Sequence, residues 1–285
     1  MLTGNIFVDL MTLMKQVSSL RYEIGQTQTA DFWRNGHILL REVATSDDIM
    51  HFQPAIKQAS YTYSTETRSL EERDTYGKAF LQTMNLWQHD EVVKEFVFAT
   101  RFAQIAADLL GVEKVRLYHD QALFKEPKGG YTPWHQDQYY WPLDTNKTIT
   151  MWMPLVDIDD EMGMLTFASG SHQKGPIGRV EISDESEERY SAYIAANGFP
   201  IAKANAMKAG DATFHLGWTI HSAGKNNSDT KTREVMTIIY FAAGARITPP
   251  QNEHQVNDIK AWMGGNLVGD IADSYLNPTL NWKQD

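Results

Sequence analysis

A series of short strand-forming segments from residue 113 onward limits the fold more than any other feature of the sequence. These segments span residues 115–124, 148–158, 164–168, 212–215 and 234–243. Clusters of Gly, Pro, Asp and Asn separate them, which is typical of an antiparallel barrel or sandwich. No helix of βαβ spacing divides most of them, so a parallel doubly wound sheet is disfavoured. We therefore predict a mostly β domain with helical additions.

The first third of the chain is predicted to be mainly helical. A first helix would carry an apolar face, which either packs on the domain or forms a dimer contact. This face consists of Leu10, Met11, Met14, Val17 and Leu20. A short buried strand is expected at 38–40, and Thr45 then caps a helix that runs toward residue 59. Asp90 opens another helical stretch, and a further one spans 99–110 and ends at Gly111.

The whole chain, residues 1–285, is predicted to form one domain. It would divide into an N-terminal helical extension at 1–29, a helical support at 30–112, a core at 113–247 and a C-terminal tail at 248–285. The core contains an acidic insertion at about 171–210. Long insertions are usually functional or mobile. This one is either a partly helical excursion near the mouth of a site or a solvated spacer.

Composition and charge exclude several classes of protein. The formal net charge is −10 and no basic run stands out, which argues against binding nucleic acid through its phosphates. The chain has no cysteine, so disulfides and thiolate metal sites are impossible. No apolar run approaches the roughly 20 residues that a membrane span needs, and no basic segment precedes a signal-like stretch. A cytoplasmic protein without a membrane partner is the expectation, and the oligomeric state stays open.

One triplet of residues carries most of the chemical information. His135-Gln136-Asp137 is the only His-x-Asp in the sequence, and His221 follows downstream with Arg233 twelve residues beyond it. In a strand, residues i and i+2 share a face, so His135 and Asp137 can reach one ion. Two imidazoles and one carboxylate form the facial triad of non-haem Fe(II) oxygenases. An arginine after the distal histidine offers a planar fork for a dicarboxylate.

Other histidines compete for the ligand positions. His215 lies at an even offset from His221, so both can face inward, but only His221 has a polar turn and a downstream arginine. We therefore expect His215 to make a structural hydrogen bond. His89 falls in a helical stretch and His119 beside an adjacent aspartate, and neither arrangement suits a shared ion. His172 is interpreted as part of a structural turn.

An ordered set of segments resembles the phytanoyl-CoA hydroxylase (phytanoyl-CoA dioxygenase) family of Fe(II)- and 2-oxoglutarate-dependent dioxygenases. The set covers most of residues 30–245. It consists of Phe32-Trp-Arg-Asn-Gly-His-Ile-Leu-Leu, Leu123-Phe-Lys125, Trp134-His-Gln-Asp137, Trp152-Met-Pro-Leu-Val, Gly163-Met-Leu-Thr-Phe-Ala-Ser-Gly-Ser-His172 and the stretch from His221 to Arg233. Each piece alone is weak evidence, whereas the order of the set is specific.

The resemblance implies a double-stranded β-helix (a cupin-like jelly roll) with N-terminal helices packed on it and the metal at one mouth. It implies His135, Asp137 and His221 as Fe(II) ligands and makes Arg233 the partner of the distal carboxylate of 2-oxoglutarate. Because Asp137 is retained, hydroxylation or another oxidation is favoured over halogenation. The reaction would consume O2 and release succinate and CO2 while an unactivated C–H bond is oxidised.

Further co-substrate residues follow from the same resemblance. Lys125 matches a position that can approach 2-oxoglutarate, and Trp152 matches an aromatic residue that often lines this pocket. The sequence departs from the family at Ala223, where a small hydroxyl residue is common. Ser222 is then the expected source of a hydroxyl contact.

Rings flank the triplet and suggest a substrate wall. Trp134, Tyr139, Tyr140 and Trp141 are the candidates, with Tyr139 first because its parity matches Asp137 if the strand continues. They indicate a small, partly apolar organic substrate, and no basic cradle for a CoA phosphate is evident. Two alternatives stay open: a catalytically silent barrel that binds a metal or small molecule, and a metal-dependent isomerase or hydrolase that does not use 2-oxoglutarate. The latter would leave Arg233 unexplained.

Overall fold

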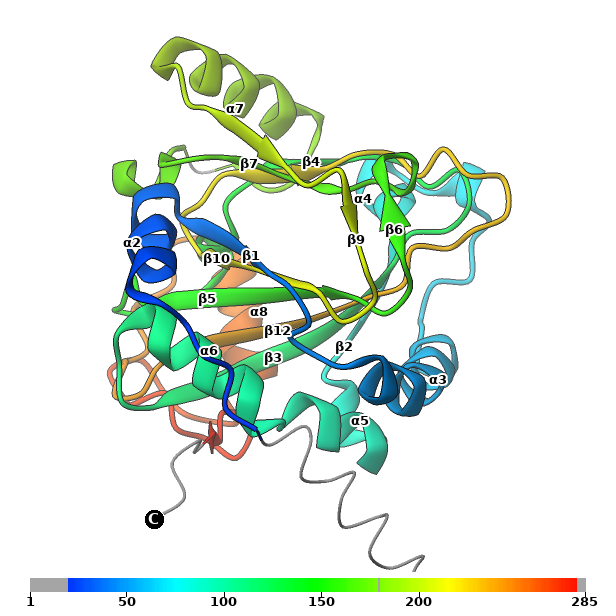
Figure 1. Cartoon of the computed structure of the whole chain (residues 1–285). Coiled ribbons are helices and arrows are strands. Elements are labelled where there is room, and N and C mark those ends of the chain that lie inside the picture. The colour runs from blue at the N-terminus through cyan, green and yellow to red at the C-terminus, as the bar shows by residue number, and fades with distance from the viewer. Residues whose placement is uncertain (1–19, 179, 281–285) are drawn as a thin grey trace, which may run out of the picture.

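Two antiparallel sheets facing each other form the centre of the molecule (Figure 1). The computed structural model describes residues 20–178 and 180–280. The predicted apolar face at Leu10, Met11, Met14 and Val17 lies outside the described residues. Among the described residues, every pair of neighbouring strands is antiparallel, which confirms the predicted class of sheet.

The larger sheet has the strand order β1-β10-β5-β12-β3-β13, with β2 also paired to β3. Its strands are β1 (His37–Leu40), β2 (Leu81–Met84), β3 (Val115–Phe124), β5 (Thr148–Pro154), β10 (Ala212–Leu216), β12 (Val235–Ala242) and β13 (Thr279–Leu280). The smaller sheet has the order β4-β11-β7-β8. Its strands are β4 (Thr132–His135), β7 (Leu165–Ala168), β8 (Ile201–Lys203) and β11 (His221–Ala223). A separate ribbon pairs β6 (Ile158–Asp159) with β9 (Ala206–Met207).

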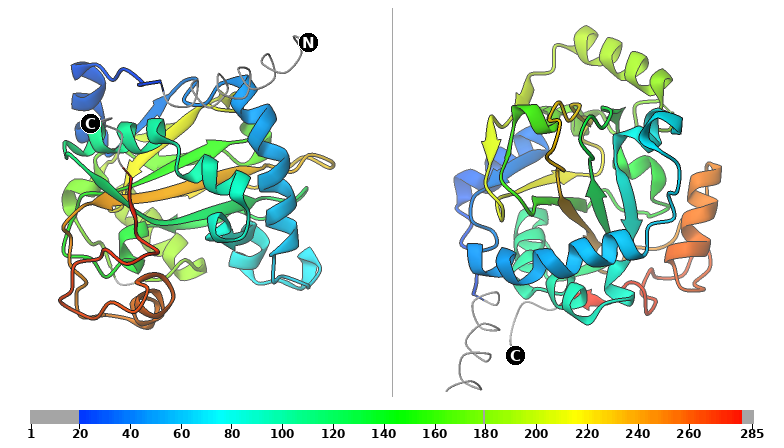
Figure 2. Two further views of the ribbon diagram at one scale, coloured as in Figure 1. Left: turned by 90° about the horizontal axis from the view of Figure 1, so that it is seen from below. Right: turned by 90° about the vertical axis from the view of Figure 1, so that its right-hand side faces the viewer.

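Helices pack around the two sheets. They are α2 (Gln26–Asn35), α3 (Ser46–Thr62), α4 (Thr75–Ala79), α5 (Glu91–Val97), α6 (Thr100–Leu110), α7 (Asp184–Asn197) and α8 (Glu253–Trp262). Short 3-10 turns are η1 (Leu70–Glu72), η2 (Leu86–Gln88), η3 (Asp137–Tyr140), η4 (Asp160–Met162) and η5 (Ser171–Lys174). Helices α3, α5 and α6 lie against the larger sheet, and α7 lies outside the smaller one (Figures 1 and 2).

The alternation of side chains along the larger sheet separates its core from its pocket. In β5, Ile149, Met151 and Met153 enter the main hydrophobic core with the helices, whereas Thr150 and Trp152 line the space between the sheets. Successive residues of a strand point to opposite faces, so an apolar core and a partly polar inner face can come from the same strand. The inner face of the larger sheet is therefore free to carry functional side chains.

Three helix boundaries predicted in the first third are confirmed. Thr45 caps α3 and exchanges hydrogen bonds with Asp48 in a capping box. The Asp90 carboxylate accepts the amides of Val92 at 2.8 Å and Val93 at 3.0 Å at the start of α5. Gly111 ends α6 in the left-handed conformation that suits glycine.

Two segments contribute more than the sequence predicted. The insertion at about 171–210 contains α7, as a partly helical excursion would, but it also supplies β8, which pairs with β7 in the smaller sheet. The segment after residue 248 was expected to be a tail. It instead forms α8, which lies beside η3 because Gln255 and Asn252 donate to the Tyr139 carbonyl. Among the helices of residues 20–178 and 180–280, none is both long and apolar enough to span a bilayer.

We expect Asp90→Ala to lower the free energy of unfolding by about 1 kcal/mol, because two amides at the start of α5 lose their acceptor. Denaturant titration measures the loss. Glu91→Ala is the matched control: its side chain is 88% exposed and pairs with Lys94 only at 3.3 Å. An equal loss in both variants would contradict the capping role of Asp90.

Candidate metal and co-substrate site

The two candidate histidine ligands face each other across a pair of strands. His135 of β4 and His221 of β11 are register partners, and their ring centroids lie 4.1 Å apart. The Nδ1 atoms approach backbone carbonyls, that of Pro133 at 2.7 Å for His135 and that of Thr219 at 3.0 Å for His221. A carbonyl only accepts, so Nδ1 carries the proton and Nε2 keeps its lone pair in both rings. Both free lone pairs are available to one ion.

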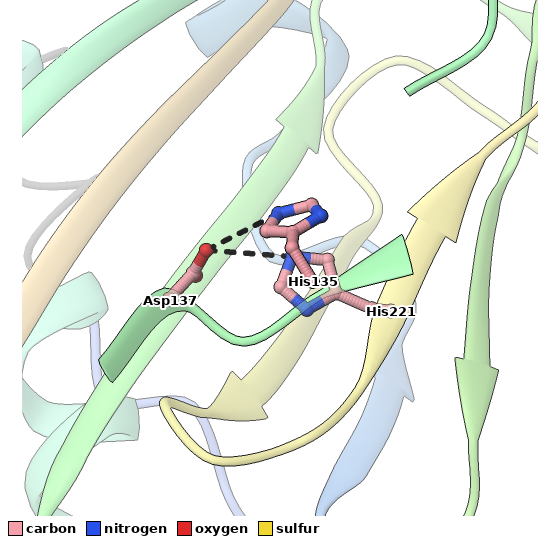
Figure 3. Close-up of side chains that lie close together, drawn as sticks. All are labelled: His135, Asp137 and His221. Atoms are coloured by element: carbon pink, nitrogen blue, oxygen red, sulfur yellow. Dashed lines mark ion pairs between the residues drawn. The ribbon is translucent and has the colours of Figure 1, made fainter. Parts of the chain in front are cut away.

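Asp137 completes the group of three (Figure 3). Its Oδ1 lies 3.4 Å from His135 Nε2 and 3.5 Å from His221 Nε2, and one donor atom of each residue lies within 4.8 Å of the others. The predicted strand ends at His135, and Asp137 opens η3. Gln136 between them is still extended, with φ −124° and ψ 122°, so the two side chains stay on one side. The three candidate ligands converge even though the strand does not continue.

The second oxygen of Asp137 is held by two further side chains. Oδ2 accepts a hydrogen bond from Thr150 Oγ1 at 2.9 Å and contacts His215 Nε2 at 3.2 Å. The expected structural hydrogen bond of His215 is therefore confirmed. Such partners fix the orientation of a metal-binding carboxylate and leave its other oxygen directed at the ion.

The charges in this group suit a divalent cation. Burial would raise the pKa of Asp137, but the neighbouring His221, His135 and His215 rings hold it well below its ordinary value. Burial, together with the neighbouring His135, lowers the pKa of His221 well below its usual range. At neutral pH the carboxylate is charged and the His221 imidazole is neutral. Two nitrogens and one carboxylate oxygen on one side of a cavity fit Fe(II).

Arg233 lies in the same pocket as a buried cation. Only 1% of it is exposed, burial lowers its pKa to about 9, and it remains charged at neutral pH. Its Nη1 donates to the Gly163 carbonyl at 2.6 Å, and its guanidinium carbon lies 5.3 Å from the centre of the Trp152 ring. Its Nε is buried without a partner, and it forms no ion pair with a carboxylate of the described chain. An unpaired donor on a buried cation fits a carboxylate ligand.

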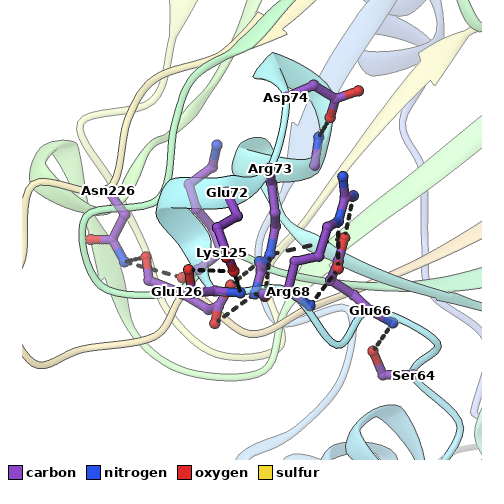
Figure 4. Close-up of polar contacts among 11 residues, drawn as sticks. Ser64, Glu66, Arg68, Glu72, Arg73, Asp74, Lys125, Glu126 and Asn226 are labelled. Atoms are coloured by element: carbon purple, nitrogen blue, oxygen red, sulfur yellow. Dashed lines mark hydrogen bonds and ion pairs between the residues drawn. The ribbon is translucent and has the colours of Figure 1, made fainter.

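The turn between β11 and β12 returns Arg233 to the pocket. Asn226 is buried, and its Nδ2 contacts the carbonyls of Lys125 at 3.1 Å and Glu126 at 3.0 Å (Figure 4). The same Nδ2 also contacts the Lys231 carbonyl at 2.7 Å. Arg233 and Lys125 also exchange two backbone hydrogen bonds, each of 2.9 Å. One amide side chain therefore ties the start of β12 to the end of β3.

Two predicted co-substrate residues, Lys125 and Ser222, do not line the cavity. Lys125 is fully buried, and its Nζ donates to the Gly130 carbonyl instead of lining the cavity. Burial, together with the charge of Arg233, lowers its pKa well below the ordinary value. Ser222 lies between His221 and Ala223, which both line the cavity, so strand alternation turns Ser222 away. Trp152 does line the cavity, beside Arg233.

Of the four aromatic residues predicted to contact the substrate, two line the cavity and two do not. Tyr140 and Trp141 line the cavity, but Tyr139 and Trp134 do not. Tyr139 was preferred on the assumption that the strand continues, and η3 breaks that parity. Trp134 instead packs against the hydrophobic cluster that includes Tyr190.

The cavity has a volume of about 450 Å³. Several of the residues that line it were not predicted from the sequence. Thr132 and His119 line its interior; His119 had been considered only as a metal ligand. Asp74, Tyr76, Glu181, His254 and Asp258 also belong to the lining. They come from segments near α4, α7 and α8, and no local pattern marks residues that only tertiary packing brings to the site.

Several solved structures share this fold. The epimerase SnoN from nogalamycin biosynthesis matches with a TM-score of 0.74 and 21% identity, covering 91% of this chain and 96% of that one. The carbocyclase SnoK from the same biosynthesis matches with a TM-score of 0.73 and 23% identity, covering 91% and 97%. EctD from S. alaskensis matches with a TM-score of 0.65 and 21% identity, covering 81% of each chain. The predicted jelly roll is confirmed.

Comparison of the sequence with known protein families identifies the family of this chain. The phytanoyl-CoA dioxygenase (PhyH) model matches residues 32–235, and the chain belongs to this family. It is therefore an iron- and 2-oxoglutarate-dependent dioxygenase with O2 as the oxidant. A probable alpha-ketoglutarate-dependent hypophosphite dioxygenase of Stutzerimonas stutzeri is 22% identical over 237 residues, 76% of this chain and 79% of that protein. The 1-deoxypentalenic acid 11-beta-hydroxylase of Streptomyces exfoliatus is 26% identical over 190 residues, 62% of this chain and 61% of that protein.

We expect Thr150→Val to weaken Fe(II) binding by about 10- to 100-fold, because Asp137 loses a partner that orients it. Anaerobic titration of the apoprotein with Fe(II) measures this. Thr237→Val is the control, since Thr237 also lines the cavity but donates to the Gln121 carbonyl at 3.2 Å. If both variants bind Fe(II) as the natural protein does, Thr150 does not orient a ligand.

Proposed function

We propose that this enzyme hydroxylates, or otherwise oxidises, an unactivated C–H bond of a small, partly apolar organic molecule. His135, Asp137 and His221 bind Fe(II), and Arg233 binds the distal carboxylate of 2-oxoglutarate. The observation that carries the proposal is the buried, unpaired guanidinium of Arg233 in the same cavity as the convergent histidines and aspartate. Two alternatives would give this buried charge no ligand: a catalytically silent barrel, and an isomerase or hydrolase that does not use 2-oxoglutarate.

The residues of the chain bind, orient and shield the reactants. With 2-oxoglutarate and O2, bound Fe(II) supplies an oxidant for C–H bonds while succinate and CO2 are released. Thr150 and His215 hold Asp137 so that the carboxylate presents one oxygen to the ion. Trp152 covers one side of the Arg233 guanidinium and keeps water from the salt bridge. Because Asp137 keeps the carboxylate ligand, oxidation is favoured over halide transfer.

The charge of the cavity limits the substrate class. Arg233 is the only Lys or Arg among the described residues that line it, and it lies in the interior. The outer lining carries Asp74 and Glu181, which are exposed, and Asp258. Burial raises the pKa of Asp258 to about 6, so it is still mostly ionised at neutral pH. A mouth lined by carboxylates and by Tyr140 and Trp141 favours a neutral or cationic organic substrate over a polyanion.

Anaerobic addition of 2-oxoglutarate to the Fe(II)-loaded protein tests the co-substrate assignment. We expect Arg233→Ala to weaken 2-oxoglutarate binding by about 100-fold or more, since charge-assisted hydrogen bonds are worth roughly 1.5–3 kcal/mol each. The weak visible charge-transfer band reports binding, and succinate after admission of air reports turnover. Arg189→Ala, which removes an exposed i,i+4 ion pair on α7, should leave both unchanged. Undiminished affinity in Arg233→Ala would count decisively against the proposed clamp.

The charge argument makes a second prediction about substrates. Acyl-CoA thioesters should not stimulate succinate formation, because their nucleotide phosphates would meet the carboxylates at the mouth. The matched control is the same acyl group on pantetheine, which lacks those phosphates. Succinate release is measured with each compound at saturating 2-oxoglutarate. Stimulation by the CoA thioester that equals or exceeds the pantetheine thioester would overturn the argument from charge.

A further inference from the structure

We propose that Asp258 of α8 is the counter-ion of a positively charged amino group on the substrate. The inference rests on the proposed function, because it narrows the substrate of the same cavity from a neutral or cationic molecule to an organic ammonium. It gives a ligand to a residue that the sequence patterns did not indicate and that α8 brings to the mouth of the cavity.

Asp258 is the one carboxylate of the described cavity lining that has neither a cation nor a backbone amide as its partner. Of the others, Asp137 contacts the candidate histidine ligands, and Glu181 pairs with His254 at 2.5 Å. Asp74 is exposed to solvent and caps α4. Asp258 is only partly exposed, so its charge is one that no ion pair of the described chain offsets.

The direct partners of Asp258 are neutral groups. Its Oδ2 accepts the Tyr118 hydroxyl at 2.6 Å, and the Trp262 side chain is a second donor. An ionised carboxylate has about four acceptor sites, so about two stay free for a ligand. Burial raises the pKa of Asp258 to about 6, because these neutral donors do not replace the lost hydration in full. A cation in the cavity would supply what is missing.

A β-bulge directs Tyr118 toward Asp258. Along the pairing of the two strands, β3 advances by two residues, from 117 to 119, while β12 advances by one. Tyr118 is the additional residue, and bulges redirect side chains in this way. Its ring joins the cluster that includes Ile239, which lines the cavity, and its hydroxyl reaches α8. The carboxylate is therefore held in place before a ligand binds.

Aromatic rings adjoin this carboxylate. The ring centre of Tyr118 lies 5.5 Å from that of Trp141, which is only 6% exposed and lines the cavity. Tyr140 lines the cavity as well, and its ring centre lies 5.1 Å from that of His254, one turn before Asp258 on α8. A carboxylate beside aromatic rings suits an organic ammonium, because the ring faces attract the cation and cover its carbon substituents.

A metal ion does not fit this end of the cavity. Calcium and magnesium take about six or more oxygen ligands, whereas Asp258 offers a single carboxylate. Among the described residues, three possible metal ligands converge only at His135, Asp137 and His221. An ammonium needs no more than one carboxylate and a partly apolar surrounding, which is what the mouth provides.

The charge of Arg233 sets the orientation of such a substrate. Its guanidinium lies in the interior of the cavity and repels a second cation. An amino group held by Asp258 therefore stays at the mouth, and the uncharged carbon body extends inward toward the three candidate metal ligands. The C–H bond that is oxidised lies on this inner part of the molecule.

Binding of matched amines and alcohols tests the proposal. The pairs are hexylamine with hexanol, benzylamine with benzyl alcohol, and phenethylamine with phenethyl alcohol, which differ mainly in charge at neutral pH. Anaerobic calorimetric titration of the Fe(II)-loaded protein, with and without 2-oxoglutarate, measures each affinity. Asp258→Asn removes the charge and retains an acceptor for Tyr118. Asp229→Asn is the matched control, since that carboxylate is 83% exposed and lies outside the cavity lining.

We expect at least one amine to bind the natural protein about 10-fold or more tightly than its alcohol. Asp258→Asn should abolish this preference and leave the affinity for the alcohol within about 3-fold. Asp229→Asn should keep the preference. Tyr118→Phe should keep it too, because that variant loses a hydrogen bond to the carboxylate but not the charge. Melting temperatures of all variants are measured alongside.

Two results would overturn the inference: no amine binds the natural protein more tightly than its alcohol, or Asp258→Asn keeps the full preference. If Tyr118→Phe loses the preference as completely as Asp258→Asn, the carboxylate only anchors α8, and the inference fails as well. In all three cases the proposed function stands if 2-oxoglutarate still binds the Fe(II)-loaded protein. If amines are preferred but 2-oxoglutarate does not bind, the proposed function fails and Asp258 is still a cation site.

Discussion

The pairing of β11 with β4 is the interaction on which the candidate site depends. It sets His221 opposite His135, and the same two strands place Ala223 opposite Thr132. Backbone carbonyls within two residues of each histidine hold its Nδ1, so the strand backbone also orients the rings. Asp137 follows directly on the same chain segment. A shift of this register by one residue would turn the candidate ligands out of the cavity and leave the buried carboxylate without its partners.

Buried positive charge is the main energetic cost of this design. Arg233 and Lys125 are both at most 1% exposed and pair with each other through their backbones. Burial lowers the pKa of both side chains, and the charge of Arg233 lowers that of Lys125 further. Neither gains a carboxylate among the described residues. Removing charges from water without a counter-ion is expensive, and a fold retains such an arrangement when a ligand supplies the missing charge. Asn226 and the Gly163 carbonyl hold the donors in position before that ligand binds.

Local patterns predicted most of the framework and the metal-site candidates. Interactions between residues close in the sequence determine several of the predicted features, which can therefore be predicted from local residue types. They are the strand at 115–124, the caps at Thr45 and Asp90, and the end of α6 at Gly111. Strand parity failed at the site itself. The turn η3 and the β4 bulge each interrupt the two-residue period, which misdirected Tyr139 and concealed Thr132. The mouth could not be predicted, because α8 and the segment before α7 reach it only through tertiary packing.

The cavity is electrostatically divided, and this division bears on how two different small molecules can share it. Its interior carries the buried Arg233 cation, whereas its mouth carries Asp74, Glu181 and Asp258. The acidic rim repels a dianionic co-substrate, and Arg233 attracts it only farther inside. The charges therefore favour the inner end of the cavity for the co-substrate. A cationic organic molecule has the opposite preference, and a neutral one is not repelled at the rim. For the proposed neutral or cationic substrate, the charges at the two ends would hold the co-substrate inside and leave the mouth of the same cavity to the substrate.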